Sequence, residues 1–208
     1  WRDWSSDVCS SDLLGLSELV KAAGENEVSV ARFNAVLSAT GQASGKTVEQ
    51  LNGLAESLAT TTLATKDQIE AASSQLLTFG SVSGDVFDRT MTLAQDLAAT
   101  GFGSIADNAV KLGRVLEQPT ENLDALRRVG IQFNIETKDR IELLEKEGKH
   151  FEAQQVILDE IAKKVGGSGA AQGDTLMGAW HAFGQQFTIT LENVGARLGI
   201  LGDLKAGI

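Results

Sequence analysis

The chain is poor in the residues that build covalent cross-links, metal sites and large aromatic cores. Its 208 residues include one cysteine, one proline, two histidines and no tyrosine. A single cysteine excludes an internal disulfide and leaves a zinc site without its usual thiolate ligands. Beyond the first few residues, Trp180 and eight phenylalanines supply the aromatic bulk. We therefore expect a core of small and aliphatic side chains with modest stability.

Basic charge and long apolar runs are also scarce. The chain has 18 Lys and Arg against 28 Asp and Glu, a formal net charge of −10. This acidic balance argues against a self-sufficient nucleic-acid binder, which normally presents a basic stripe. No apolar run approaches the roughly 18–20 residues that a membrane-spanning helix needs. These absences favour contacts with other proteins over contacts with nucleic acid or lipid.

The first residues do not resemble a natural N-terminus. Segment 1–13 is rich in Ser and Asp, and it lacks the basic start and apolar run of a secretory signal. Residues 3–13 match, without a mismatch, the translation of a common short-read sequencing adapter. We interpret 1–13 as an adapter-derived, disordered artefact, which removes any role for Cys9. The chain stops at Ile208 without a recognisable terminus, so we expect a fragment of a longer protein.

Almost every other segment has the apolar periodicity of an α-helix, and almost none alternates as strands do. Thr47 with Gln50, and Thr65 with Gln68, each predict a capping box that satisfies backbone N–H groups at a helix start. The single proline, Pro119, ends one helix and suits the first turn of the next. Glycines fall where helices should end. The predicted apolar faces are Leu51, Leu54 and Leu58; Ile69, Ala72, Leu76 and Phe79; Phe87, Met91, Ala94 and Ala98; Ile105, Ala109, Leu112 and Leu116; and Ile157, Ile161 and Val165. The terminating glycines are Gly80, Gly101, Gly130 and Gly148.

The spacing of these signals predicts the architecture. Helices of about 10–20 residues joined by short turns pack as consecutive antiparallel neighbours. We predict an all-α fold, an array of short antiparallel helices joined by Gly/Thr/Ser turns and followed by a long C-terminal helix. A helical domain is expected over 14–165, a Gly-rich linker over 166–174, and the long, truncated helix over 175–208.

The stretch GQASGKT, residues 41–47, has the ending of a phosphate-binding loop. That motif needs four residues between its glycines, so that successive N–H groups can wrap a phosphate. Gly41 and Gly45 enclose only three, and the apolar residues upstream have the spacing of a helix rather than a strand. We interpret the stretch as a turn in which Thr47 caps the following helix.

No residue set points to catalysis or to metal binding. His150 and His181 lie far apart in the sequence, with no partner at metal-ligand spacing. We expect His150 to start a helix and His181 to lie on a helix surface. Glu142 and Lys146 belong to a mixed-charge, solvated helix face with i,i+4 pairing. We therefore predict no catalytic, cofactor-binding or metal-binding residues, and no cofactor.

The last predicted helix is rich in glycine. Gly195 and Gly199 have a spacing that lets two helices approach closely, and in lipid this motif drives helix pairing. Glu192, Asn193 and Arg197 interrupt the region. Packing on a partner helix is therefore favoured over membrane insertion, and any membrane contact is expected only through this helix.

Two stretches carry a resemblance to a known family: LSATGQASGKTVEQL (37–51) and GIQFNIETKDRIELLEKEGKHFEAQQVILDEI (130–161). Together with the Gly-rich break and Gly178-x-Trp180 after it, they resemble the tape measure proteins of long-tailed bacteriophages and prophages. The similarity spans roughly residues 33–199. The order of the motifs is more specific than any one of them.

The resemblance implies a non-enzymatic structural protein that sets phage tail length. It implies a place in the lumen of the virion tail tube, with the host cytoplasm as the site of assembly. Its implied partners are tail tube subunits and tail assembly chaperones; helix self-association is compatible with it, and direct nucleic-acid binding is not expected. The resemblance supplies no site residues, because none here matches the peptidoglycan-cleaving domains of some members. The alternatives are a membrane-active or peptidoglycan-hydrolysing part of a DNA-injection protein, and a generic cellular helical interaction module.

Overall fold

The computed structural model describes residue 28, residues 31–40 and residues 42–197, and this part of the chain consists of helices and turns without a strand. The predicted all-α class is confirmed there. The predicted artefact at 1–13 and the end of the predicted last helix, 198–208, lie outside the described residues.

Residues 31–39 are helical. The elements that follow are α2 (Val48–Thr61), α3 (Lys66–Leu76), α4 (Gly84–Ala99), α5 (Ile105–Glu117), α6 (Pro119–Asn122), the 3₁₀ helix η1 (Leu123–Val129), α7 (Ile135–Lys146), α8 (His150–Val165), α9 (Ser168–Gly173) and α10 (Leu176–Arg197).

Several helices begin and end at the signals in the sequence, although α3 ends at Leu76, before the predicted terminator Gly80. Both predicted capping boxes are present, at the starts of α2 and α3. In each box the threonine hydroxyl accepts the backbone N–H of the glutamine, and the glutamine side chain accepts the threonine N–H. Pro119 occupies the first turn of α6. Left-handed glycines follow α4, η1 and α7 at Gly101, Gly130 and Gly148.

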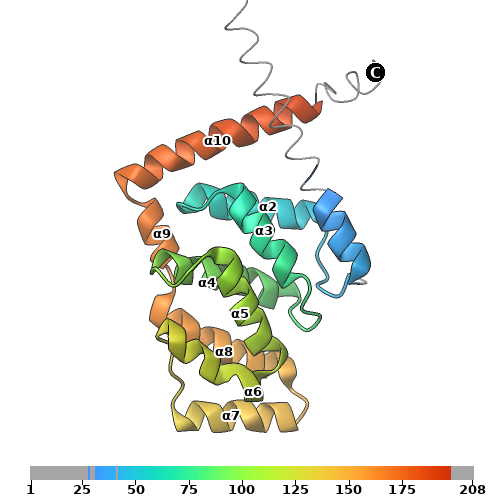
Figure 1. The fold of residues 1–208 in the computed structure, drawn as a ribbon, viewed down its shortest axis with the longest axis vertical. Coiled ribbons are helices and arrows are strands. Elements are labelled where there is room, and N and C mark those ends of the chain that lie inside the picture. Colours follow the sequence, from blue (N-terminus) through green and yellow to red (C-terminus); the bar gives the residue numbers. More distant parts are fainter. Residues whose placement is uncertain (1–27, 29–30, 41, 198–208) are drawn as a thin grey trace, which may run out of the picture.

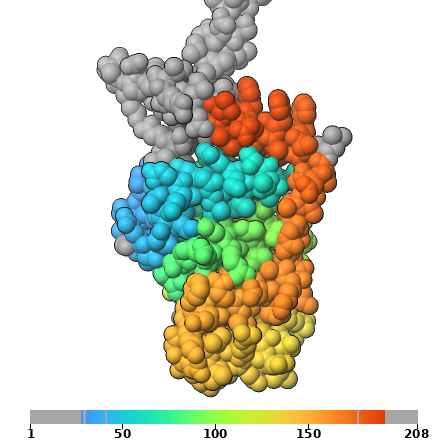
Figure 2. Space-filling view, turned by 180° about the vertical axis from the view of Figure 1, so that it is seen from behind, coloured from blue at the N-terminus to red at the C-terminus, as the bar shows by residue number. Residues whose placement is uncertain are grey.

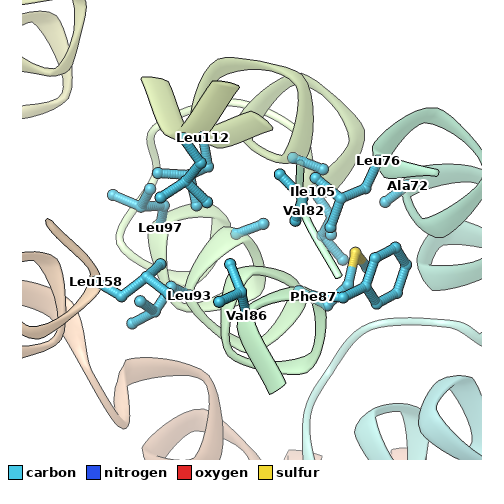
Figure 3. Close-up of a cluster of buried hydrophobic side chains, with 14 of the residues drawn as sticks. Ala72, Leu76, Val82, Val86, Phe87, Leu93, Leu97, Ile105, Leu112 and Leu158 are labelled. Atoms are coloured by element: carbon cyan, nitrogen blue, oxygen red, sulfur yellow. The ribbon is translucent and has the colours of Figure 1, made fainter. Parts of the chain in front are cut away.

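The helices are stacked around α4, near the middle of the body (Figure 1). Helix α4 packs against α5, α8 and α9, and α5 also packs against α3. Figure 3 shows the resulting cluster, in which α4 side chains such as Val86 and Leu97 meet residues of α3, α5 and α8. Phe33 and Phe87 are the only fully buried rings among the described residues, and the rest of the core is almost entirely aliphatic. This composition agrees with the expected shortage of large core side chains.

The two ends of the body are built by different helix pairs. Helices α7 and α8 pack together at one end, and α10 packs on α2 at the other (Figures 1 and 2). Helix α9 runs between them along one side. Among the described helices, none combines the length and apolar character required for crossing a bilayer.

The segment predicted to be a Gly-rich linker, 166–174, contains a helix that packs on the body. Helix α9 lies against α4 and α2. A Cβ atom at Gly169 would approach the Gln95 amide to 2.6 Å, and one at Gly173 would approach the carbonyl oxygen of Thr61 to 2.2 Å. These glycines therefore permit close packing, whereas their pattern in the sequence predicted a linker. A domain boundary at this segment stays a prediction.

Candidate functional site

The turn that resembles a phosphate loop joins two helices and pairs its lysine with α4. Lys46 Nζ lies 2.7 Å from Oδ2 of Asp88 on α4, and the Lys46 side chain is largely buried. Helical residues 31–39 precede the turn, and Thr47 caps α2 directly after it. A phosphate loop would follow a strand and offer its lysine to the ligand. The structure agrees with the interpretation of this stretch as a turn, whose lysine ties it to α4.

The two histidines lie on different helices and do not converge. His150 begins α8 as predicted, and its Nδ1 lies 2.7 Å from Oε1 of Glu145 on α7. Its Nε2 lies 3.1 Å from Nε2 of Gln154. His181 is half-buried on α10. Across the described residues, no group of three or more His, Cys, Asp or Glu is placed to hold a metal ion. The contacts of His150 therefore join α7 to α8.

A buried carboxylate fixes α9 against α4. Asp96 is 2% exposed, and its two oxygens accept the backbone N–H groups of Gly169 at 2.8 Å and Gly167 at 3.0 Å. These groups belong to the start of α9, where N–H groups lack helical partners and the helix dipole favours negative charge. Gln172 adds a second tie by donating Nε2 to the carbonyl oxygen of Ala99 at 2.7 Å. We call the first arrangement the Asp96 cap.

A second buried polar bridge fixes α8. Gln154 is 1% exposed, and its Nε2 donates to the carbonyl oxygens of Ser81 and Leu116, both at 3.1 Å. One carbonyl lies before α4 and the other near the end of α5. A single amide nitrogen has two N–H donors, so it satisfies both buried acceptors at once. Gln154 thereby sets the position of α8 relative to α4 and α5.

Surface charges form local pairs. The predicted i,i+4 pair on α7 is present, with Lys146 Nζ 2.5 Å from Glu142 Oε1. The hydrogen bond from Lys146 holds the pKa of the Glu142 carboxyl below its usual value. Both side chains are more than half exposed, so the pair contributes little to stability. The charged face of α7 is a solvated surface, as the sequence indicated.

A pocket of about 360 Å³ opens between α3, the end of α4, the start of α5 and α9. Leu63 and Ile105 contribute its larger apolar walls, and several alanines complete them. Polar groups come from Gln68, Gln95 and Gln172. No charged side chain lines it. The volume and lining suit an apolar side chain of another protein better than a charged small molecule.

Helix α10 exposes a line of large apolar side chains, which we call the α10 stripe: Met177, Trp180, Phe183 and Phe187. Each is between 61% and 73% exposed. The rings of Trp180 and Phe183 lie close, with their centroids 6.1 Å apart. Contiguous apolar surface of this kind marks a contact site. The stripe was not predicted from the sequence, where the glycines of this helix are more conspicuous; its spacings of three and four residues were the available signal.

These features define an all-helical body without a metal cluster among its described residues. Buried polar ties set the helix positions, and the apolar surfaces that remain are a pocket and a stripe. The family model for prophage tail length tape measure proteins matches residues 13–142, more than half of the chain. The chain therefore belongs to this family of structural phage tail proteins, and it is a phage tail component.

The match confirms the family expected from the sequence. It begins at Leu13, the last residue of the segment interpreted as adapter-derived, and it ends within α7. Helices α8, α9 and α10 follow the matched region. No curated protein and no solved structure matches the chain.

Proposed function

We propose that this chain is part of the length gauge of a phage tail, and that it occupies the lumen of the tail tube. Family membership over 13–142 carries the proposal. The helical character of the described chain supports it, because helices convert residue number into length in a regular way. The segment acts without catalysis; two of its titratable side chains, His150 and Asp96, are engaged in contacts between helices.

To act as a length gauge, the chain must change from a compact to an elongated form. Drawn into one helix, the roughly 150 residues from α2 to α10 would span about 225 Å at 1.5 Å per residue. The compact body has a radius of gyration of about 15 Å for this length. A gauge inside a narrow tube must be elongated, so the compact form belongs to the free chain. A core of alanine and aliphatic residues, held by few buried polar ties, keeps the cost of opening moderate.

The proposed partners follow from this role. Tail tube subunits polymerise around the elongated chain, and tail assembly chaperones hold it in the host cytoplasm before polymerisation. The apolar pocket beside α9 is a surface available for such contacts. The chain carries net negative charge, so direct nucleic-acid binding is not part of the proposal.

An in-frame deletion in the phage that encodes the full-length protein tests the gauge. Removing residues 135–165 deletes α7 and α8, about 31 residues, and should shorten tails by up to about 47 Å. Duplicating the same residues should lengthen tails by the same amount. The matched control replaces 135–165 with an unrelated helical sequence of equal length, and its tails should keep their normal length. Electron micrographs supply the measurement. Unchanged tails after deletion, or loss of tails in the deletion and in the equal-length replacement, would place this segment in a folded terminal or chaperone-binding module.

A further inference from the structure

Helix α10 has a buried face and an exposed face, which point in opposite directions. Gly178 and Ile189 are buried, and Ala182 and Gln185 between them are half-buried. At about 100° per residue these four share one side of the helix, the side that packs on α2. The α10 stripe lies on the opposite side, about 180° away. Figure 2 shows atoms of α10 projecting from this end of the body.

Three residues of the stripe, together with Gly184, follow the spacing of a coiled-coil seam. Met177, Trp180, Gly184 and Phe187 are separated by three, four and three residues, the pattern of a and d positions in a heptad. A Cβ atom at Gly184 would meet nothing within 4 Å, so this position leaves a notch in the outer face. The seam thus alternates between bulky side chains and an open space.

We propose that the α10 stripe pairs antiparallel with the same stripe of a second copy of this chain. In antiparallel pairs an a position of one helix shares a layer with a d position of the other. A two-fold axis near Ala182 sets Trp180 of one copy over the notch at Gly184 of the other. The same axis sets Met177 against Phe187, where a thioether meets an aromatic ring. Each large group meets a small or a flexible one.

The charge distribution favours a second copy as the occupant. No Asp, Glu, Lys or Arg occurs between Asp174 and Glu192, whereas the whole chain carries a net charge of −10. Two copies repel each other over most of their surface. They can meet along this neutral helix without placing like charges in contact. An isologous contact of this kind also closes with two copies and leaves no free stripe.

The exposed area is sufficient for a weak dimer. Three aromatic side chains and one methionine, each about two-thirds exposed, would bury about 500 Å² per copy. The total of about 1,000 Å² is near the lower limit of specific interfaces. We expect a dissociation constant on the order of 10 μM, because small interfaces leave little surplus over the cost of association. This pairing does not depend on the proposed role in tail length.

Sedimentation equilibrium of the 208-residue chain tests the pairing. Dimers should appear as the concentration rises through the micromolar range. Trp180→Ala should weaken association at least about tenfold, as expected for an aromatic anchor. Gly184→Trp should also weaken it, because two indoles then compete for one layer. A mixture of these two variants restores one large and one small residue in each central layer, so it should associate. Gln186→Ala, exposed beside the stripe, is the matched control and should leave the dimer unchanged.

Orientation is measured separately with spin labels on Thr190→Cys in a Cys9→Ser background. Antiparallel pairing about Ala182 places the two labelled backbone positions about 26 Å apart, and parallel pairing places them about 10 Å apart. A chain that stays monomeric to about 200 μM would overturn the proposal, as would a dimer that Trp180→Ala leaves intact or labels at the shorter distance. So would a monomer that binds phosphatidylglycerol vesicles through Trp180, because the stripe would then contact lipid.

Discussion

Replacing Asp96 with alanine should release α9 from the body. The substitution removes both acceptors of the Asp96 cap and leaves the N–H groups of Gly167 and Gly169 without their protein partner. Hydrogen bonds to a charged group contribute about 1.5–3 kcal/mol each, and water recovers part of this once α9 detaches. We expect a loss of about 3 kcal/mol in the free energy of unfolding, a large part of the roughly 5–15 kcal/mol that stabilises a domain.

Urea unfolding and amide hydrogen exchange measure this effect at two levels. With a denaturant slope of about 2 kcal/mol per M, the unfolding midpoint of Asp96→Ala should fall by about 1.5 M. Exchange at residues 167–173 should accelerate more than exchange in α4, because α9 opens first. Asp159→Ala is the matched control: this carboxylate pairs with Arg89 at 2.6 Å but is 60% exposed, so it should cost less than about 1 kcal/mol. If Asp96→Ala loses no more than the control and leaves exchange in α9 unchanged, the cap does not hold this helix.

Three further predictions concern the core and the helix starts. Ile157→Asp should cost several kcal/mol in chemical denaturation because it buries an unpaired carboxylate, whereas Leu143→Asp on the exposed face of α7 should cost little; equal losses would mean that the face of α8 is misassigned. Gly113→Ala should lower the melting temperature and cost about 1 kcal/mol, because the new Cβ would approach the ring of Phe79 to 2.4 Å. The cost of this clash outweighs the better helix propensity of alanine, and a rise in melting temperature contradicts the prediction. Hydrogen bonds from Ser104 lower the pKa of Asp107 in the folded state from its ordinary value of 3.8. The stabilisation that Asp107 provides is therefore present above pH 3.8 and is lost as the pH falls through the folded-state pKa. Asp107→Asn should remove this contribution from the acid unfolding curve, and an unchanged curve argues against it.

The sequence predicted the helical elements well because their signals are local. A capping box needs two side chains three residues apart, and the boxes at Thr47 and Thr65 are present as expected. Apolar periodicity likewise marked residues that the structure buries, such as Ile69 and Ile157. Such patterns depend on one helix at a time. They do not reveal which helices meet.

The parts that the sequence analysis missed depend on contacts between distant segments. Asp96 lies in the middle of a helical stretch and has no local mark of a cap, because the N–H groups that it accepts are about 70 residues further along the chain. In the sequence, the glycines of α9 have the composition of a linker. Their packing role is evident only from the position of the Gln95 side chain beside Gly169. The pocket beside α9 also combines residues from four separate helices, α3, α4, α5 and α9. Among these unpredicted features, only the α10 stripe had a local signal in the sequence, the three- and four-residue spacing of its large apolar side chains.

The contact between α2 and α10 determines how the body responds to tension. These two helices are far apart in sequence and lie side by side at one end of the body (Figure 1). A force that pulls on the C-terminal end of α10 loads this contact before it reaches the contact between α9 and α4. Once it parts, the load passes to α9 and its cap, and then to the helices around α4. The body would therefore lengthen in steps, from its outer helices inward, and each step would release a segment of known residue number.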